Sequence, residues 1–317
     1  MLVLNEQETI AALDWSALID ALERMFASDC VMPVRHHHDV KVPNRADATL
    51  LLMPAWVPGG YCGVKLVSVY PDNHLSGLPA VQGSYLLTSG QTGETLALIN
   101  GNALTARRTA AASALAARYL AREDASRLLM VGTGRLSLNV IEAHAKVRSI
   151  REVSIWGRNT ANAEKTAEQA RELGFDAIAV TDLEKAARQA DIISCATLAT
   201  EPLIKGEWLQ PGSHLDLIGG FKPSMREADD RAIARARVFV DTRAGAMSEA
   251  GDIVQPLQNG SLKPEAICGE LAELVGARVP GRRRPDEITF FKSVGAALED
   301  LAGAILAYET ALNTKIR

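Results

Sequence analysis

The chain has 317 residues, a formal net charge of −4 and a hydrophobic content of 47%. This length allows two domains and a sizeable core. Because the net charge is small and negative and the basic residues are scattered, a nucleic-acid groove or an anionic membrane surface is not expected, and small molecules are the expected partners.

The four cysteines are far apart and form no CxxC pair, which argues against a zinc site and a disulfide framework. No apolar run approaches the roughly 18 residues that span a bilayer. The N-terminus reaches an acidic residue, Glu6, almost at once, so no signal segment is visible. We therefore expect a reduced, cytoplasmic protein without a membrane anchor.

The first third of the chain changes from a helical to a strand pattern. Residues 5–27 carry apolar side chains near helical spacing, with Asp14 as a cap between two helices. Short apolar runs separated by turns then predict strands at residues 34–42, 49–53, 61–70, 83–87 and 95–99. The result is a β-rich unit of about 60 residues.

Three histidines, His36 to His38, lie in the first of these strands. Consecutive strand residues face opposite ways, so at most His36 and His38 share a face. A metal site needs a third ligand, and the nearby sequence suggests none. We favour plain strand histidines and predict no metal.

An alanine-rich helix at residues 102–121 carries Arg107 and Arg108. Neighbouring helical residues point about 100° apart, so both guanidiniums cannot lie on one face. One is expected to be buried and the other solvated, and the spacing alone does not decide which.

A glycine turn, Gly132-Thr133-Gly134, follows an apolar strand at residues 128–131 and precedes a helix that starts at Arg135. The first glycine allows a tight turn, the second lets backbone N–H groups approach a pyrophosphate, and the helix N-terminus adds partial positive charge. Ser137 replaces the usual third glycine, and its small side chain still allows helix and strand to pack closely. This pattern is typical of half a dinucleotide site.

The second strand of this unit, residues 153–156, ends at Trp156-Gly157-Arg158-Asn159-Thr160. An NAD site normally has Asp or Glu here to bind the ribose hydroxyls, and this segment has no carboxylate. A guanidinium beside small polar side chains suits a 2′-phosphate. We therefore predict NADP(H) as the preferred cofactor, with NAD(H) possible. The alternative is that Arg158 is only a solvated cation at a strand end.

Strands continue to alternate with helices up to about residue 281. They are predicted at residues 177–180, 192–195, 214–218 and 238–240. This alternation predicts a parallel sheet with helices on both faces, the doubly wound arrangement of a Rossmann-type α/β fold.

A strand at residues 288–291 and a helix at 294–313 end the chain. We expect them to return to the N-terminal unit. The predicted domains are therefore a discontinuous, β-rich α+β domain at 1–124 and 286–317 and a nucleotide-binding domain at 125–285, with a cleft between them.

The chain resembles the ornithine cyclodeaminase and μ-crystallin family over essentially its whole length. The similarity lies in the order and spacing of several short motifs. They are Met53-Pro54-Ala55, Gly63-Val64-Lys65, Pro71-Asp72-Asn73, Gly77-Leu78-Pro79, Thr92-Gly93, residues 104–111, the glycine turn, Lys292-Ser293-Val294-Gly295 and Glu299-Asp300-Leu301.

The resemblance implies a substrate and dimerisation domain beside a Rossmann domain, in a homodimer. It implies that Arg35, Lys65 and Arg108 hold the substrate carboxylate, and so it selects Arg108 over Arg107. Such a group of two guanidiniums and one ammonium would fix a small α-carboxylate. On the cofactor side it adds Thr197, Ser293 and Gly295 near the nicotinamide; the alternative for the last two is an ordinary capped turn. Thr133, Arg135 and Leu136 belong to the pyrophosphate turn and its flank.

Two departures from the family bear on the reaction. Phe221 stands where cyclodeaminases typically have Asp, and Leu51 replaces a second acidic residue. Oxidising ornithine needs a proton acceptor and a group for the distal amine, and neither side chain serves. The pattern favours NADPH-dependent reduction of a cyclic ketimine, Δ1-pyrroline-2-carboxylate or Δ1-piperideine-2-carboxylate. The alternatives are an ornithine cyclodeaminase, a related amino-acid dehydrogenase, or a non-catalytic NADP-binding protein.

Overall fold

The computed structural model describes residues 1–315 and divides the chain into two compact units. Unit 1 comprises Met1–Arg108 and Ala296–Arg317, and unit 2 comprises Thr109–Gly295. These boundaries differ from those predicted at 124/125 and 285/286. The predicted fold class is confirmed: a Rossmann-type parallel sheet in one unit and a β-rich α+β arrangement in the other.

Unit 1 is built on a six-stranded sheet with the order β1-β6-β5-β4-β3-β2. The strands are β1 (Leu2–Leu4), β2 (His36–Val40), β3 (Ala48–Trp56), β4 (Tyr61–Val69), β5 (Val81–Ser89) and β6 (Thr95–Asn100), and a 3₁₀ turn, η1 (Pro71–Ser76), joins β4 to β5. Strands β2 to β6 pair antiparallel in sequence order, and β1 pairs parallel with β6. The pattern of the sequence predicted every strand except β1.

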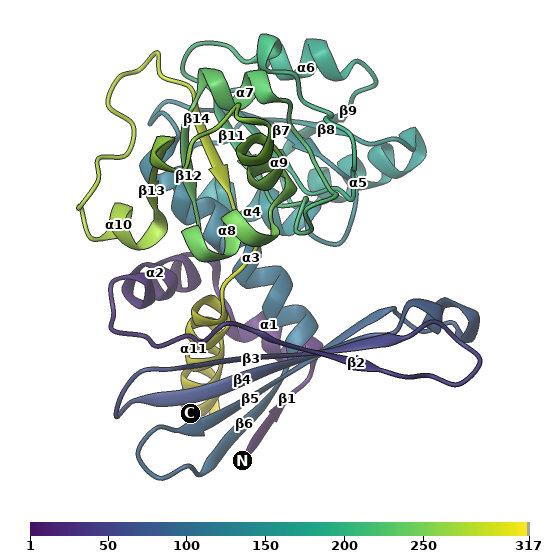
Figure 1. Ribbon diagram of the computed structural model, residues 1–317, viewed down its shortest axis with the longest axis vertical. Coiled ribbons are helices and arrows are strands. Elements are labelled where there is room, and N and C mark those ends of the chain that lie inside the picture. Colours follow the sequence, from purple (N-terminus) through teal and green to yellow (C-terminus); the bar gives the residue numbers. More distant parts are fainter. Residues whose placement is uncertain (316–317) are drawn as a thin grey trace. The chain divides into compact units, whose positions relative to one another are not determined.

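Helices cover one face of this sheet (Figure 1). They are α1 (Glu6–Ala12), α2 (Trp15–Phe26) and α11 (Ala297–Lys315). Asp14 caps α2 as predicted, because its carboxylate accepts a hydrogen bond from the backbone N–H of Ala17 at 3.1 Å. Helix α2 buries a full apolar stripe and packs on α11, which lies across β3, β4, β5 and β6.

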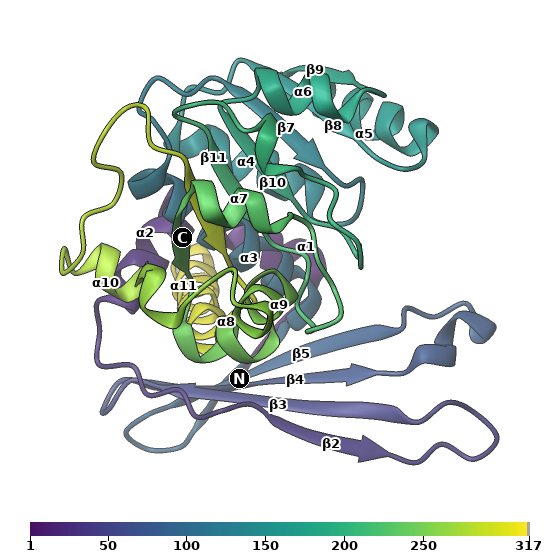
Figure 2. The same cartoon turned by 45° about the horizontal axis from the view of Figure 1, so that its top comes forward.

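No helix of unit 1 covers the opposite face of the sheet within the described residues (Figure 2). Strand residues alternate between the two faces. Met53, Lys65 and Tyr85 are buried on the helix face, whereas Leu66 and Leu98 on the other face are 41% and 38% exposed. We call five neighbouring apolar residues of this second face, Leu52, Val64, Leu66, Leu86 and Leu98, the open face.

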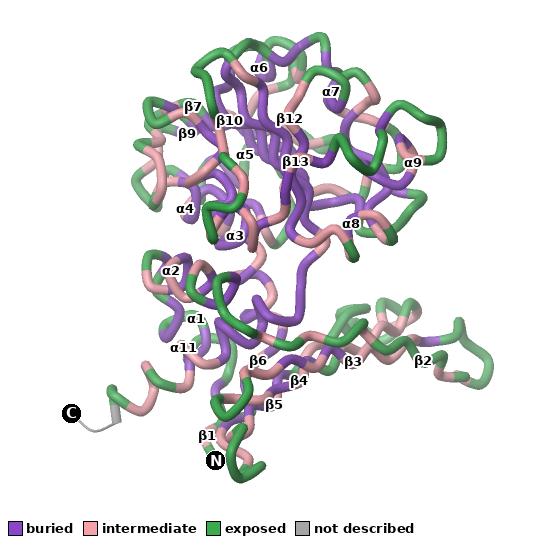
Figure 3. The backbone as a smooth tube through the Cα atoms, turned by 60° about the vertical axis from the view of Figure 1, so that its left-hand side comes forward, coloured by how far each residue is buried: buried purple, intermediate pink, exposed green. Residues whose placement is uncertain are grey.

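Unit 2 is built on an eight-stranded, wholly parallel sheet with the order β13-β12-β14-β11-β10-β7-β8-β9. The strands are β7 (Arg127–Val131), β8 (Glu152–Trp156), β9 (Asp176–Ala179), β10 (Ile192–Cys195), β11 (His214–Leu217), β12 (Arg237–Val240), β13 (Ile267–Glu270) and β14 (Thr289–Lys292). Its central strands are buried along their length (Figure 3), as expected for a parallel sheet covered on both faces.

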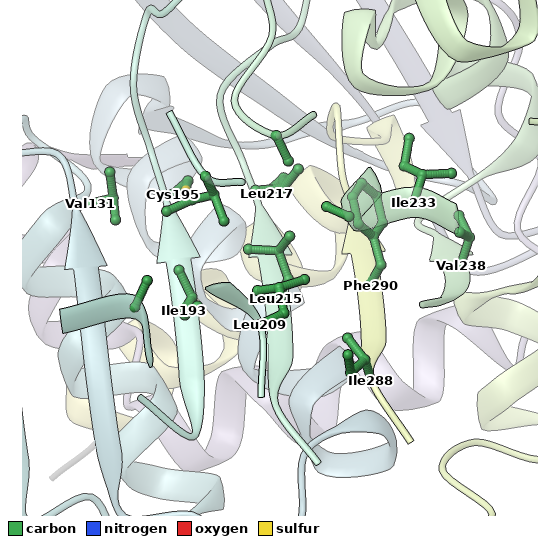
Figure 4. Packing of buried hydrophobic residues seen from close by; sticks show 14 of the residues in the cluster. Val131, Ile193, Cys195, Leu209, Leu215, Leu217, Ile233, Val238, Ile288 and Phe290 are labelled. Carbon is green, nitrogen blue, oxygen red and sulfur yellow. The ribbon is translucent and has the colours of Figure 1, made fainter. Parts of the chain in front are cut away.

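The predicted strand at residues 288–291 is present as β14, but it belongs to unit 2. It lies between β11 and β12 and pairs parallel with both. Phe290 packs with Leu215, Leu217 and Val238 in the core on one side of the sheet (Figure 4). All four residues of this strand are buried, as expected for a strand in the middle of a parallel sheet, which explains why it does not join the N-terminal unit.

The remaining helices lie in unit 2, except that the first residues of α3 belong to unit 1. They are α3 (Gly101–Leu120), α4 (Ser137–Val147), α5 (Thr160–Glu172), α6 (Leu183–Gln189), α7 (Asp230–Arg235), α8 (Arg243–Glu249), α9 (Gly251–Asn259) and α10 (Leu271–Val275), with 3₁₀ turns η2 (Gly206–Trp208) and η3 (Pro264–Ala266). None of the described helices is both long and apolar enough to cross a bilayer.

Candidate functional site

A cavity of about 520 Å³ lies in unit 2 at the carboxyl ends of β7, β8 and β10. This is the edge at which parallel α/β sheets bind nucleotides. Six of the residues predicted to bind the cofactor line it: Gly132, Thr133, Gly134, Arg158, Asn159 and Thr197. Arg135 and Leu136 follow the turn and lie outside the lining.

The glycine turn has the geometry that its sequence predicts. Gly132 has φ = +121°, and a Cβ there would lie 2.6 Å from the carbonyl oxygen of Ala196. A Cβ at Gly134 would meet no atom within 4 Å, so this position faces open space beside the cavity. Helix α4 begins at Ser137 and not at Arg135. The Ser137 hydroxyl donates to the carbonyl of Gly132 at 2.9 Å, so this replacement for the third glycine ties the turn to the helix.

Arg158 is exposed and lies just after β8, on the wall of the cavity. The next residue, Asn159, caps α5: its side-chain oxygen accepts from the N–H groups of Ala161 and Asn162 at 2.9 and 3.3 Å. The N-terminus of a 13-residue helix therefore follows Arg158 directly in the chain, and Arg158 and Asn159 both line the cavity. A guanidinium and a helix N-terminus together favour an anionic group such as a phosphate.

Ser293 and Gly295 follow β14 in a turn outside the cavity lining. The buried carboxylate of Asp241 accepts from the N–H groups of Val294 and Gly295 at 2.7 and 2.8 Å. The turn is thus held rigidly by a side chain from the end of β12. Contact of Ser293 and Gly295 with a nicotinamide stays a prediction.

A cluster of buried charged side chains lies in unit 1, on the face of the sheet that the helices cover. The ammonium of Lys65 lies 2.7 Å from Oδ2 of Asp300. The Arg108 guanidinium lies 3.0 Å from Oδ1 of Asp300 through Nε, and 2.7 Å from Glu299 through Nη1. All four side chains are at least 94% buried. We call these residues the cation cluster.

The cation cluster brings together two of the three predicted carboxylate anchors and balances them with two carboxylates. Lys65 and Arg108 keep donors for a further anion. Within residues 1–315, Lys65 forms an ion pair with Asp300 alone, and the bonds of Arg108 leave its Nη2 available. Glu299 and Asp300 stand in the first turn of α11, where the helix dipole stabilises negative charge.

Burial lowers the pKa of Lys65 to about 8, assisted by the neighbouring Arg108 and opposed by Asp300. For Arg108, burial acts to lower the pKa, but Asp300 and Glu299 outweigh it and the pKa is raised. Lys65 is therefore a cation at neutral pH that can release a proton slightly above it, whereas Arg108 is permanently charged.

The third predicted anchor, Arg35, is half-buried and immediately precedes β2. Its role as an anchor stays a prediction. The expectation that one of the adjacent helix arginines is solvated is wrong: Arg108 is buried in the cation cluster, and the Arg107 guanidinium lies 4.1 Å from the centre of the Trp15 ring. Stacking on the indole shields the Arg107 guanidinium from water on one side.

Leu51 and Phe221, the two departures from the cyclodeaminase pattern, are placed in different units. Leu51 is half-buried in β3, and Phe221 is 44% exposed after the Gly219-Gly220 turn that follows β11. Neither provides a proton acceptor. His36 to His38 are exposed on β2. Within residues 1–315, no three His, Cys, Asp or Glu side chains form a group that could hold a metal.

Reasoning from the sequence missed the partners of the two anchors. Glu299 and Asp300 were noted only as part of a family motif, since nothing local indicates that they contact residues almost 200 positions earlier. The available signal was a pair of adjacent carboxylates at the start of an otherwise apolar helix, because buried acids require cationic partners.

Comparisons with known proteins agree with this arrangement. The model of the "Ornithine cyclodeaminase/mu-crystallin family" matches residues 1–315. The Delta(1)-pyrroline-2-carboxylate reductase of Paracoccus denitrificans is 38% identical over 89% of this chain and 92% of its own. The Thermococcus litoralis enzyme of the same name, solved with NADH and L-proline, is 36% identical and superposes with a TM-score of 0.92 over 99% of this chain and 98% of its own.

An archaeal alanine dehydrogenase dimer with bound NAD is 29% identical and has a TM-score of 0.90, covering 99% of this chain and 97% of that one. A family model that spans nearly the whole sequence, together with relatives above 30% identity, establishes the family of this chain. This chain belongs to the ornithine cyclodeaminase/mu-crystallin family.

Proposed function

We propose that this protein reduces the C=N bond of a small cyclic imino acid, Δ1-pyrroline-2-carboxylate or Δ1-piperideine-2-carboxylate, with NADPH. The comparisons show the enzyme class, an NAD(P)H-dependent oxidoreductase that acts on carbon–nitrogen bonds. The observation that carries the finer assignment is the cation cluster: Lys65 and Arg108 are held by Asp300 and keep donors for a carboxylate.

When bound, a reduced nicotinamide would supply the hydride that C2 of the ring receives. The side chains of the protein hold the substrate and handle the proton. Arg108 and Lys65 bind the C2 carboxylate, and Arg35 completes the set of anchors. Lys65 gives a proton to the ring nitrogen, which receives the π electrons of the C=N bond as C2 takes the hydride. A donor with a pKa of about 8 is charged at neutral pH and still loses its proton readily.

An imine substrate fits better than ornithine because the side chains at the two departure positions are apolar. Oxidation of ornithine would begin with loss of a proton from an ammonium group, and Leu51 and Phe221 accept none. Reduction of an imine that is already formed needs only an anchored carboxylate and a proton donor, and the cation cluster offers both.

NADPH is the proposed reductant because the segment that follows β8 carries an arginine and no carboxylate. Arg158 and the N-terminus of α5 form a site for a 2′-phosphate where a carboxylate would otherwise bind ribose hydroxyls. The solved relative from Thermococcus litoralis contains NADH, so the preference is proposed from this chain's own residues. Ser293 and Gly295 are proposed to contact the nicotinamide end.

The protein is proposed to act as a homodimer in the cytoplasm. The open face presents apolar side chains that unit 1 leaves uncovered within the described residues, and the archaeal alanine dehydrogenase relative is a dimer. Free thiols at all four cysteines agree with a reducing compartment.

The decisive experiment is a screen of NADPH oxidation against five- and six-membered cyclic imino acids, with ornithine plus NAD⁺ as the competing assay. Turnover of an imine without ammonia release from ornithine supports the proposal. Ornithine turnover without imine reduction would replace it with cyclodeaminase activity. If neither substrate is turned over although nucleotide binds, the non-catalytic alternative holds.

The cofactor preference is tested separately with Arg158→Asp. Removing the guanidinium and adding a carboxylate should reverse the preference, lowering the ratio of kcat/KM for NADPH over NADH by roughly 100-fold, because the interaction of residue 158 with the 2′-phosphate changes from attraction to repulsion. The matched control is Arg151→Asp, an exposed arginine just before β8 and outside the cavity lining. An unchanged ratio in the Arg158 variant would show that this residue does not bind the phosphate.

A further inference from the structure

Three fully buried ionisable residues of unit 2, Glu227, Asp252 and Lys292, form a group that the proposed reaction does not use. Lys292, the last residue of β14, donates to the carbonyls of Leu217 and Gly219 and lies 3.6 Å from Asp252. Asp252 accepts from the backbone N–H groups of Glu227 and Ala228 at 2.8 and 3.0 Å. We call these three residues the buried triad.

Glu227 connects the buried triad to the nucleotide cavity. Its Oε1 accepts from both the backbone N–H and the hydroxyl of Thr197, at 2.7 and 2.8 Å. Thr197 lines the cavity in the loop that follows β10. One carboxylate therefore fixes the backbone and the side chain of a residue on the cavity wall.

The loop after β11 rests on the same group. A Cβ at Gly219 would collide with the Glu227 carboxylate, and a Cβ at Gly220 would lie 2.5 Å from Oδ2 of Asp252. The Gly-Gly turn thus leaves no space between its backbone and the buried acids. The loops that follow β10 and β11, at the ligand-binding edge of the sheet, therefore both pack against Glu227 and Asp252.

The charge of the buried triad depends on Glu227. If Asp252 and Lys292 are counted as an ion pair, the triad is neutral when Glu227 is protonated and carries one negative charge when it is ionised. Oε2 of Glu227 is buried and has no hydrogen-bond partner within the described residues, so ionisation leaves a charged oxygen unsatisfied.

Burial raises the pKa of Glu227 to about 7, against the opposing effect of Lys292, and Asp252 raises it further. Cys195 at the end of β10 is a further ionisable group near Glu227, and burial raises the pKa of that thiol well above its usual value. Glu227 is therefore the member of this group that titrates near neutral pH.

We propose that Glu227 is a positioning residue of the nucleotide site, which holds Thr197 on the cavity wall and takes up a proton when a reduced dinucleotide binds. A dinucleotide brings an anionic pyrophosphate to the cavity. An additional negative charge beneath the cavity wall is unfavourable, so binding favours the protonated form of Glu227. This proposal rests on the proposed use of a nicotinamide dinucleotide and on nothing about the imine substrate.

The test measures the affinity of the enzyme for NADH, without substrate, from pH 6 to pH 8.5 by fluorescence. NADH is the probe because the 2′-phosphate of NADPH itself titrates near pH 6. The Kd of the wild-type protein should rise about three- to tenfold as the pH passes through 7, the size expected for one nearby charge. Glu227→Gln keeps an acceptor for Thr197 but has no charge, so its Kd should stay flat near the low-pH value.

Two control variants separate the role of Glu227 in holding Thr197 from the effect of its charge on NADH binding. Glu201→Gln removes an exposed carboxylate from the lining of the same cavity and should retain the inflection near pH 7. Glu227→Ala removes the acceptor for Thr197 and should weaken NADH binding at every pH. A pH-independent Kd in the wild-type protein, or an inflection that persists in Glu227→Gln, would overturn the inference.

A measurement on the unmodified protein decides the question if the variants fail to fold. Calorimetric titration with NADH at pH 7, in buffers of different ionisation enthalpy, should show uptake of a fraction of a proton. Binding without proton uptake overturns this inference and leaves the proposed reduction standing. Failure of both NADH and NADPH to bind overturns both.

Discussion

At the scale of single residues, Asp300 determines the geometry of the cation cluster. Its two carboxylate oxygens hold different cations, Oδ2 the ammonium of Lys65 and Oδ1 the guanidinium of Arg108. One carboxylate therefore sets the distance between the two proposed anchors. Because the cluster is buried and contains equal numbers of positive and negative groups, loss of Asp300 leaves a positive charge without compensation.

Asp300→Asn should shift the pH dependence of imine reduction to lower pH. Lys65 must be protonated to bind the carboxylate and to donate its proton, so kcat/KM falls as the pH rises through its pKa of about 8. Without the attraction of Asp300 the pKa of Lys65 drops further. We therefore expect the alkaline limit, the pH above which kcat/KM falls, to move down by about one pH unit or more. Profiles of kcat/KM against pH for wild type and variant measure the shift.

Glu299→Gln is the matched control for this prediction. Glu299 contacts Arg108 directly but is only the weakest of the influences on Lys65, so the alkaline limit should move much less. The thermal stability of both variants should be measured in parallel, because leaving a buried charge unpaired lowers the free energy of unfolding by about 3–5 kcal/mol. Equal shifts in the two variants would contradict a specific role for Asp300.

The residues of the site differ in how far the sequence could predict them. The glycine turn and Arg158 were predicted from local patterns, since a strand, a turn and a helix lie within 32 residues of one another. Lys65 and Arg108 were selected by a family resemblance. Asp300 and Glu227 received no role, because their contacts join segments that no periodicity or spacing connects.

At the scale of elements, the glycine turn shows two different requirements at neighbouring positions. Gly132 is constrained by its own fold, through a positive φ and the adjacent Ala196 carbonyl, whereas Gly134 faces open space. The first glycine serves stability, and the second leaves room for a ligand. Substituting each glycine by alanine therefore separates folding from binding.

Gly132→Ala should lower the thermal midpoint by several degrees, since a strained φ costs about 1–3 kcal/mol and the new methyl group would lie against a carbonyl oxygen. Gly134→Ala should leave the midpoint nearly unchanged and weaken NADPH binding by about tenfold or more. Differential scanning calorimetry and fluorescence titration measure the two effects. Equal loss of stability in both variants would refute this division.

Strand length alone did not decide which elements could be predicted, because β9, β10, β11, β12 and β14 have four residues each and were all predicted. Strands of five or more residues in unit 1 were recognised by their alternation or by the turns that flank them. Strand β1 has three residues and β13 has four, including Gly269, so neither gives a pattern that differs from a loop. Both lie at sheet edges, where pairing with a neighbour defines the strand.

At the scale of the whole molecule, the open face predicts self-association. Its rows run across neighbouring strands, with Leu66 opposite Leu52 and Leu86 between Val64 and Leu98. We expect Leu66→Asp together with Leu98→Asp to convert a dimer to a monomer, as measured by light scattering after gel filtration. Leu173→Asp, a change at an exposed leucine of unit 2, is the control and should remain dimeric. A wild-type monomer would refute the proposal.

The late position of β14 in the chain has a consequence for synthesis on the ribosome. Its partners β11 and β12 are made first, yet they are joined in the sheet only through Thr289–Lys292. The helix that covers the sheet of unit 1, α11, also belongs to this last segment. A nascent chain that stalls before Thr289 would leave two strand edges unpaired and an apolar surface uncovered. We therefore expect the incomplete chain to be prone to aggregation until translation is nearly complete.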